Sequence, residues 1–419
     1  MPIDIDRLLR NPESFAGSRQ TSRQAMRFIA SHLHALSDLA EARELFKRAL
    51  EFAASSGDEC NQAHAFRLNA ARLRLAGRYD EAAAALDQSA EFGRCPCCAT
   101  DLQWKRGFLA LTLGDQGTAI IECGKAIESY LTSSAKAVQD GHFILAEILL
   151  AASGAPWNVT GQAFCGQGDV PKSIAALRIA DVVTRAGVGV VPEERLVALL
   201  GRDLPEPGRQ AFKLRNYRWW DRVAVPCPSL PTSAIRDNYN EAAFGNYLIA
   251  LEMSEDPADR AAALTHTLNL LRRKGMPPHR KALMHWLAAC LKADRWHTEP
   301  SSIKRSHLAS SGDSNMRKAR DFLLKDLKPT RLPDLVAFIC DAARLPWHAK
   351  NPSKALNDIV TSLGERRDMV EASLREADPQ LYAAWMDAVE SQGVSVVSAV
   401  EQLRKSSGCS WPMLLSNAA

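Results

Sequence analysis

The chain has 419 residues, of which 46% are hydrophobic and 24% are charged, and its formal net charge is +4. These proportions are typical of soluble globular proteins and exclude a wholly disordered or fibrous chain. The length exceeds that of one ordinary compact core, so two or three domains or an extended repeat array are expected.

The first residues alternate charged and apolar side chains and lack the apolar segment that a secretory signal requires. The most apolar stretch, Phe143 to Ala152, is shorter than the roughly 18 residues of a spanning helix and contains Glu147. The sequence therefore predicts a cytoplasmic protein without a membrane partner. Its ten cysteines are expected to be free thiols, or in part metal ligands, rather than a disulfide framework.

Residues 20 to 186 show helical periodicity in pairs of amphipathic segments that are separated by short turns. The clearest pair has Ala70 in its first helix, Gly77 in the turn and Ala82 at the start of its second helix. The offsets from Gly77 to Gly114 and from Ala82 to Ala119 are both 37 residues. Two landmarks at one offset indicate an internal repeat.

A further unit runs from Trp157 to Ala180 and contains Gly161 and Phe164, and an earlier, weaker unit runs from Met26 to Ala49. This pattern of small residues and turn glycines resembles the tetratricopeptide repeat, whose period is about 34 residues. The resemblance implies a stack of about four helix pairs with a concave surface for a partner. An extra helix-length segment, about Ser133 to Ser153, interrupts the period.

The expected fold is all-α, because no convincing strand signal is present. We expect an N-terminal extension over residues 1–19, a tetratricopeptide-like α-solenoid over 20–186, a Pro- and Gly-rich linker over 187–233 and a C-terminal helical domain over 234–419. Within the C-terminal domain, the polar, Ser-rich segment from Arg295 to Ser314 is expected to be a loop.

The repeat resemblance favours an adaptor or regulatory protein that holds a peptide or helix of another protein in its groove. The alternative for the polar side chains of the first helices is ordinary exposure to solvent. The residues expected to line the groove are Asn61, His64, Arg67, Asn69, Arg72, Gln103 and Arg106. No nucleophile elbow, phosphate-binding glycine loop or pair of carboxylates is recognisable, so the sequence gives no support to an enzyme and implies no organic cofactor.

The charge distribution suggests a second function. Residues 272–331 contain about fifteen Lys and Arg against five Asp and Glu, so this segment is near +10 and the remainder near −6. Basic side chains interleaved with Trp286 and Trp296 suit phosphate contacts and base stacking in a nucleic acid. An acidic protein partner, or a solvated face with its tryptophans in the core, would give the same pattern. The candidate contacts are Arg272, Arg273, Lys274, Arg280, Lys281, Lys292, Arg295, Lys304 and Arg305.

The most distinctive local feature is the cysteine-rich sequence Cys95-Pro-Cys97-Cys98, which follows the second helix of the clearest pair. Cys60 and His64 lie near the start of the first helix of that pair, and the two ends of an antiparallel pair are neighbours. Thiolates and an imidazole suit zinc, although this spacing is no recognised zinc-finger pattern. The alternatives are a redox pair of Cys95 and Cys98 and simple packing of small residues. The candidate zinc ligands are Cys60, His64, Cys95, Cys97 and Cys98.

Overall fold

A computed structural model of the chain describes residues 22–23, 25–26, 29–30, 39–75, 77–187, 244–272, 276, 278–325, 332–348, 352–361, 363–364, 366–377, 379–390 and 395–406. The regular secondary structure of these residues is entirely helical, which confirms the all-α class. The chain divides into two compact units, Met1–Tyr247 and Leu248–Ala419. The expected linker lies outside the described residues from residue 188 onward. None of the described helices combines the length and the apolar composition needed to cross a membrane.

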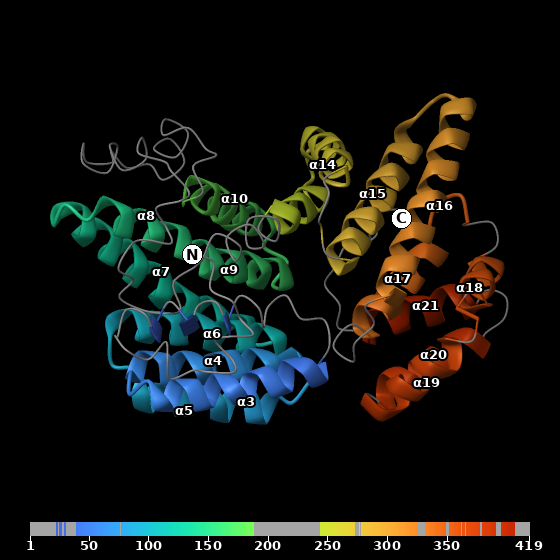
Figure 1. Ribbon diagram of the computed structural model, residues 1–419. Coiled ribbons are helices and arrows are strands. Elements are labelled where there is room, and N and C mark those ends of the chain that lie inside the picture. The colour runs from blue at the N-terminus through green and yellow to red at the C-terminus, as the bar shows by residue number, and fades with distance from the viewer. Residues whose placement is uncertain are drawn as a thin grey trace. The chain divides into compact units, whose positions relative to one another are not determined.

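The first unit is a stack of neighbouring helices. Its helices are α3 (Leu39–Ser55), α4 (Glu59–Leu75), α5 (Tyr79–Phe92), α6 (Pro96–Thr112), α7 (Gln116–Gln139), α8 (Phe143–Ala152), α9 (Gly154–Gly166) and α10 (Val170–Gly187). Figure 1 shows them stacked from α3 and α5 at one end to α10 at the other. Helix α4 packs on α5, α6 on α7 and α9 on α10, while α4, α6 and α9 also contact one another in sequence. These contacts define three stacked helix pairs, and α3 packs on the first of them.

The turns inside the three pairs share one construction. Gly77, Gly114 and Gly168 follow the first helices with φ angles of 74°, 79° and 79°, a left-handed conformation that glycine adopts without a steric penalty. The residue after each glycine donates its backbone N–H to the carbonyl five residues earlier, at 2.9 Å in all three turns. In the second turn, the Asp115 carboxylate then accepts the backbone N–H of Thr118 and caps the next helix. The glycine landmarks of the sequence therefore mark helix ends.

Small residues bring the two helices of a pair close together. Gly107 and Ala119 lie twelve positions apart, as do Gly161 and Ser173. A Cβ atom at Gly107 would lie 3.1 Å from the Ala119 carbonyl oxygen, and one at Gly161 would lie 2.4 Å from Cγ of Leu177. The Ser173 hydroxyl donates a hydrogen bond to the Gly161 carbonyl at 2.8 Å. The close approach leaves no room for a side chain at either glycine.

A single helix separates the second and third pairs. The interruption expected at about Ser133 to Ser153 corresponds to the last turns of α7 and the whole of α8. Helix α8 packs on α7 and α10 through an apolar sequence in which Ile148, Leu149 and Leu150 are buried. This added helix, which follows a glycine turn of its own at Gly141, explains why Gly168 in the turn of the third pair comes 54 residues after Gly114 instead of 37.

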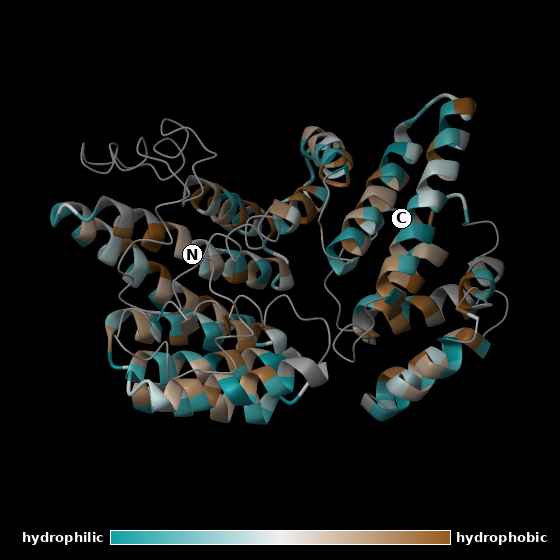
Figure 2. Cartoon of the chain, viewed as in Figure 1, coloured by the Kyte–Doolittle hydropathy of each residue, from teal (hydrophilic) through white to brown (hydrophobic). Residues whose placement is uncertain are grey.

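The second unit is also helical. Its helices are α14 (Pro257–Leu270), α15 (Pro278–Thr298), α16 (Ser302–Lys325), α17 (Leu332–Ala343), α18 (Pro352–Thr361), α19 (Arg366–Ala377), α20 (Pro379–Glu390) and α21 (Ser395–Ser406). Helices α15 and α16 form a long hairpin, α14 packs on α15, and α17 packs on α18 and α21. The Trp286 side chain is fully buried and meets the Phe338 ring edge-on, with 5.7 Å between centroids. Figure 2 shows hydrophobic and hydrophilic residues alternating along the helices, as amphipathic helices require.

The expectation of a loop from Arg295 to Ser314 is wrong. Helix α15 continues to Thr298 and α16 begins at Ser302, so most of this segment is helical. The buried residues of α16 begin at Gly312, and they are Gly312, Asn315, Met316, Ala319 and Leu323. Packing of α16 on α15 supplies the stability that its Ser-rich sequence lacks by intrinsic propensity.

Candidate functional site

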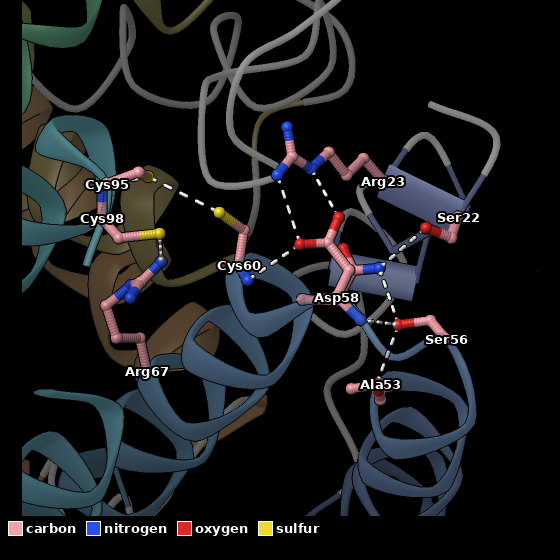
Figure 3. Close-up of polar contacts among 10 residues, drawn as sticks. Ser22, Arg23, Ala53, Ser56, Asp58, Cys60, Arg67, Cys95 and Cys98 are labelled. Carbon is pink, nitrogen blue, oxygen red and sulfur yellow. Dashed lines mark hydrogen bonds and ion pairs between the residues drawn. The ribbon is translucent and has the colours of Figure 1, made fainter. Parts of the chain in front are cut away.

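Three cysteines of the first unit converge at the start of two helices. Cys60, Cys95 and Cys98 place their sulfur atoms within 4.8 Å of one another, and we call these residues the thiol cluster. The sulfur atoms of Cys60 and Cys95 are 3.5 Å apart. Figure 3 marks this contact with a dashed line. Cys60 and Cys98 are buried and Cys95 is half-buried. The thiol cluster therefore has two buried thiols and one that is partly exposed to solvent.

The position of Cys60 is fixed by the start of α4. Asp58 precedes this helix, and its carboxylate accepts the Cys60 backbone N–H at 3.0 Å. The guanidinium of Arg23 holds the other oxygen of the same carboxylate at 2.6 Å, and the Asp58 side chain is only 2% exposed. A capped and buried helix end of this kind holds the first turn of α4, including Cys60, in one conformation.

Cys95 and Cys98 are positioned by the start of α6. Cys95 is the N-terminal capping residue of this helix, and its sulfur accepts the backbone N–H of Cys98 at 3.3 Å. Pro96 occupies the first helical turn, where its missing N–H costs no hydrogen bond. The N-terminal ends of α4 and α6 thus both lie at the thiol cluster, and their partial positive charges favour thiolates over thiols.

A buried arginine lies beside the cluster. Arg67 of α4 is 1% exposed, and its guanidinium lies 3.7 Å from the Cys98 sulfur. The same guanidinium forms an ion pair with Asp101 and donates to the Ser89 hydroxyl at 2.9 Å. These bonds orient a positive charge toward Cys98, which is the arrangement that stabilises a thiolate.

The remaining two candidate ligands lie outside the thiol cluster. His64 is buried one turn further along α4, and its ring nitrogens are not among the atoms that converge with the Cys60 sulfur. Cys97 is half-buried on the first turn of α6, and burial raises the pKa of its thiol to about 11, with Cys95 and Asp101 adding to the effect. Neither Cys97 nor His64 therefore belongs to the group of residues whose ligand atoms lie close enough to share one metal ion.

A groove of about 910 Å³ runs along α7 and α9, and we call it the α7–α9 groove. Its lining residues are Ile120, Gly124, Ile127, Glu128, Leu131, Thr132, Ala135, Lys136, Gln139, Asp140, Trp157, Thr160 and Phe164. On α7 they recur every three or four residues, which places them along one face of the helix. From Ile120 to Gln139 this face is about 28 Å long at 1.5 Å per residue.

The floor of the groove is apolar and its rim is charged. Ile120, Leu131, Trp157 and Phe164 contribute large apolar side chains that are half-buried, while the rim residues of α7 are exposed. The indole N–H of Trp157 is buried and has no hydrogen-bond acceptor among the described residues. An open apolar surface with large aromatic side chains is typical of a binding site.

The structure distributes the residues expected to face a partner over several environments. Asn61, His64 and Arg67 are buried inside the stack, so they present no surface to another molecule. Asn69, Arg72 and Gln103 are half-buried, and only Arg106 is exposed. Sequence reasoning concentrated on the first helices of the pairs and missed the α7–α9 groove. The apolar and small residues spaced along the second helix α7 were the signal that could have located it.

The basic residues of the second unit are also spread out. Arg272, Arg295 and Lys304 are exposed, and Arg280, Lys281, Lys292 and Arg305 are half-buried, whereas Arg273 and Lys274 lie outside the described residues. Trp286 is fully buried, so it is not available for stacking on a base. The Trp296 ring is half-buried, and the Arg305 guanidinium lies 5.6 Å from its centroid. Of the two tryptophans, Trp296 is therefore the one whose ring is accessible beside a basic side chain among the described residues.

In comparisons with known proteins, no family model, no curated protein and no solved structure matches the chain.

Proposed function

We propose that this protein is an interaction adaptor whose N-terminal helix pairs form a tetratricopeptide-like stack and hold an amphipathic helix of a partner protein in the α7–α9 groove. The groove is the observation that carries the proposal. The shared glycine turns and the close helix contacts at Gly107 and Gly161 support the assignment to stacked repeats. The partner's function, rather than any chemistry of this chain, would then determine the biological outcome.

A helix suits the groove better than an extended peptide does. The groove walls are faces of α7 and α9, whose backbone N–H and C=O groups are already bonded within each helix. An extended peptide would bring unsatisfied backbone groups to this surface, whereas a helix satisfies its own. Apolar side chains at every third or fourth position of the partner helix would meet Ile127, Leu131 and Phe164.

The chemistry of the groove also restricts the partner helix. Trp157 and Phe164 are the kind of aromatic residues that dominate binding energy at the centre of interfaces. The exposed rim carries Glu128, Lys136 and Asp140, so a partner with charges of both signs beside its apolar stripe is expected.

The proposal is tested with a photo-crosslinking residue at Ala135, which is exposed and lines the groove. The matched control carries the same residue at Ala90, which is exposed on α5. We expect crosslinks from Ala135 alone to one segment of a host protein. A synthetic peptide of that segment should gain helix content in circular dichroism when it binds the full chain.

Gly124 allows the groove to be filled without disturbing the core. A Cβ atom at Gly124 meets nothing within 4 Å, so Gly124→Trp places its ring in the groove instead of in the stack. We expect this variant to keep the helix content of the native chain and to bind the peptide at least about tenfold more weakly, a loss of about 1.4 kcal/mol. Equal crosslinking from both positions, or unchanged affinity of Gly124→Trp, would exclude the groove as the partner site.

The α15–α16 hairpin favours nucleic-acid binding as a second candidate function. Residues 278–325 contain ten Lys and Arg against four Asp and Glu, and Lys304, Arg317 and Lys318 are exposed on α16. Such a surface would contact phosphates without stacking, because Trp286 is buried. The affinity for DNA and RNA should then fall steeply as the salt concentration rises. This salt dependence should be weaker in a triple variant that carries Gln at Lys304, Arg317 and Lys318. No affinity at low salt would exclude this function.

A further inference from the structure

We infer that the thiol cluster binds a zinc ion through Cys60, Cys95 and Cys98, and that the ion joins the first helix pair to the second. This site lies at the ends of α4 and α6, apart from the residues that line the α7–α9 groove, so it stands independently of the proposed adaptor function. Soft thiolate ligands select zinc and copper(I) over magnesium and calcium.

The spacing of the three sulfur atoms suits such an ion. Zinc–sulfur bonds of about 2.3 Å in a tetrahedral arrangement put neighbouring sulfur atoms about 3.8 Å apart. The Cys60 and Cys95 sulfur atoms are 3.5 Å apart, and all three lie within 4.8 Å of one another. The separations of the three sulfur atoms therefore differ from those of a zinc site by at most about 1 Å, a change of the size that side-chain rotation supplies.

The surroundings of the sulfur atoms resemble the outer shell of a metal site. The backbone N–H of Cys98 donates to the Cys95 sulfur at 3.3 Å, and the Arg67 guanidinium lies 3.7 Å from the Cys98 sulfur (Figure 3). Hydrogen bonds and a fixed positive charge of this kind orient ligands and offset the negative charge of three thiolates. The helix N-termini at Cys60 and Cys95 act in the same direction.

The site would accept the ion from the half-buried side of Cys95. Three protein thiolates leave one tetrahedral position for water or an external ligand. Each thiol that binds releases its proton to solvent, so uptake of one Zn²⁺ by three thiols liberates up to three protons and changes no oxidation state. Because Cys60 and Cys95 are 35 residues apart, the bound ion would link α4 to α6 across the whole of α5.

The test uses the full chain, purified and kept reduced with a phosphine. Cobalt(II) is titrated in as a spectroscopic probe, since its bonds to thiolates give intense charge-transfer absorption, and Zn²⁺ is then added to displace it. We expect one equivalent of Co²⁺ to bind with this absorption and one equivalent of Zn²⁺ to abolish it. A chain that shows no such absorption and retains no zinc would overturn the inference.

The matched variants are Cys95→Ser and Cys97→Ser, which change two positions at the start of α6 that only Pro96 separates. Serine is a good N-terminal capping residue, so Cys95→Ser removes a proposed ligand while keeping the start of α6. We expect Cys95→Ser to weaken zinc affinity at least about 100-fold and to lose the zinc-dependent rise of the unfolding temperature, with unchanged helix content. Cys97→Ser should keep the native affinity within about threefold, because Cys97 lies outside the thiol cluster.

Two further outcomes would contradict the zinc assignment. Equal loss of affinity in Cys95→Ser and Cys97→Ser would show that the ligand set is not the thiol cluster. A separate titration with copper(I), against a competing chelator, would show whether the cluster takes that ion instead; stoichiometric Cu⁺ binding with no uptake of Zn²⁺ or Co²⁺ would assign the site to copper.

Discussion

Arg67 of α4 and Asp101 of α6 form an ion pair between two neighbouring helix pairs, and their side chains are only 1% and 4% exposed. The Asp101 carboxylate also accepts the indole N–H of Trp104 at 2.6 Å, so its charge is both paired and hydrogen-bonded. Loss of one partner from such a pair leaves the other charge buried without compensation, which costs about 3–5 kcal/mol. The pair therefore makes the contact between α4 and α6 specific.

The first prediction concerns this pair. We expect Arg67→Met to lower the free energy of unfolding by about 3–5 kcal/mol, and the double variant with Asp101→Leu to recover much of that loss. The measurement is urea-induced unfolding followed by circular dichroism. Arg106→Ala is the control, because it breaks an exposed pair with Asp87 and should change stability by less than about 0.5 kcal/mol. Equal effects of Arg67→Met and Arg106→Ala would contradict the buried pair.

The second prediction concerns the close helix contacts. A Cβ atom at Gly107 would lie 2.6 Å from the Cys123 sulfur, and one at Gly161 would lie 2.4 Å from Leu177. We expect alanine at either position to lower stability by about 1–3 kcal/mol, because the helices must separate to admit it. Gly124→Ala is the matched control on α7: its Cβ meets open space, so it should raise stability by about 0.5–1 kcal/mol. Thermal unfolding of the three variants distinguishes these effects, and stabilisation at Gly107 or Gly161 would contradict the packing.

The third prediction concerns a carboxyl group of the second unit. Burial raises the pKa of Asp294 to about 6, although Arg260 of α14 lies 3.8 Å away and opposes the shift. Burial also raises the pKa of the nearby Glu252, and the charges of Asp294 and Asp341 add to that rise. The folded state favours the protonated form of Asp294. The contribution of this carboxyl group to the free energy of unfolding is therefore fully present below about pH 4 and is lost as pH rises through about 6.

We therefore expect the native chain to lose up to about 3 kcal/mol of stability between about pH 3 and pH 7 through Asp294. Asp294→Asn should flatten this part of the curve, whereas Asp321→Asn, at an exposed position of α16, should leave it unchanged. Unfolding free energies measured at half-unit pH intervals provide the comparison. An Asp294→Asn curve that keeps the native slope would rule out Asp294 as its source.

The fourth prediction compares two histidines of the second unit. A hydrogen bond from His348 to the Asp313 carboxylate, 3.3 Å away, raises the pKa of His348. Burial lowers the pKa of His285, although its contact with Asn315 opposes the shift. The pair of His348 and Asp313 thus stabilises the fold below the ordinary histidine pKa of about 6.5 and loses this effect as pH rises through the raised value.

Nuclear magnetic resonance titration of the ring protons measures both histidines in one experiment. We expect His348 to titrate above about 6.5 and His285 below it. Asp313→Asn should lower the pKa of His348 without moving that of His285. Titration of both rings at the same pH in the native chain would contradict the assigned contacts.

Local patterns in the sequence were enough to predict the helical class and the glycine turns. Gly77 and Gly114 lie at helix ends because their left-handed conformation is a local property of the backbone. The error at Arg295 to Ser314 has the opposite cause. Serine-rich sequence has weak helix propensity, and the contact between α15 and α16 that overrides it joins residues distant in the chain.

The candidate site was only partly predictable for the same reason. The expectation that Cys60 would meet Cys95 and Cys98 followed from the antiparallel arrangement of helices, and the three sulfur atoms do converge. The burial of Arg67 could not be read from its neighbours, because its partner Asp101 lies 34 residues away on another helix. An isolated arginine in an amphipathic segment is usually exposed, and only the tertiary pairing reverses that.

The glycine turns also have a consequence for the evolution of such a chain. Each helix pair begins and ends within its own segment and contacts mainly its neighbours, so whole pairs can be duplicated or lost without rebuilding a common core. Helix α8 is an example of a smaller addition: it enters between two pairs, leaves both glycine turns intact and lengthens one interval. Relatives of this chain are therefore expected to differ in the number of helices between turns more than in the turns themselves.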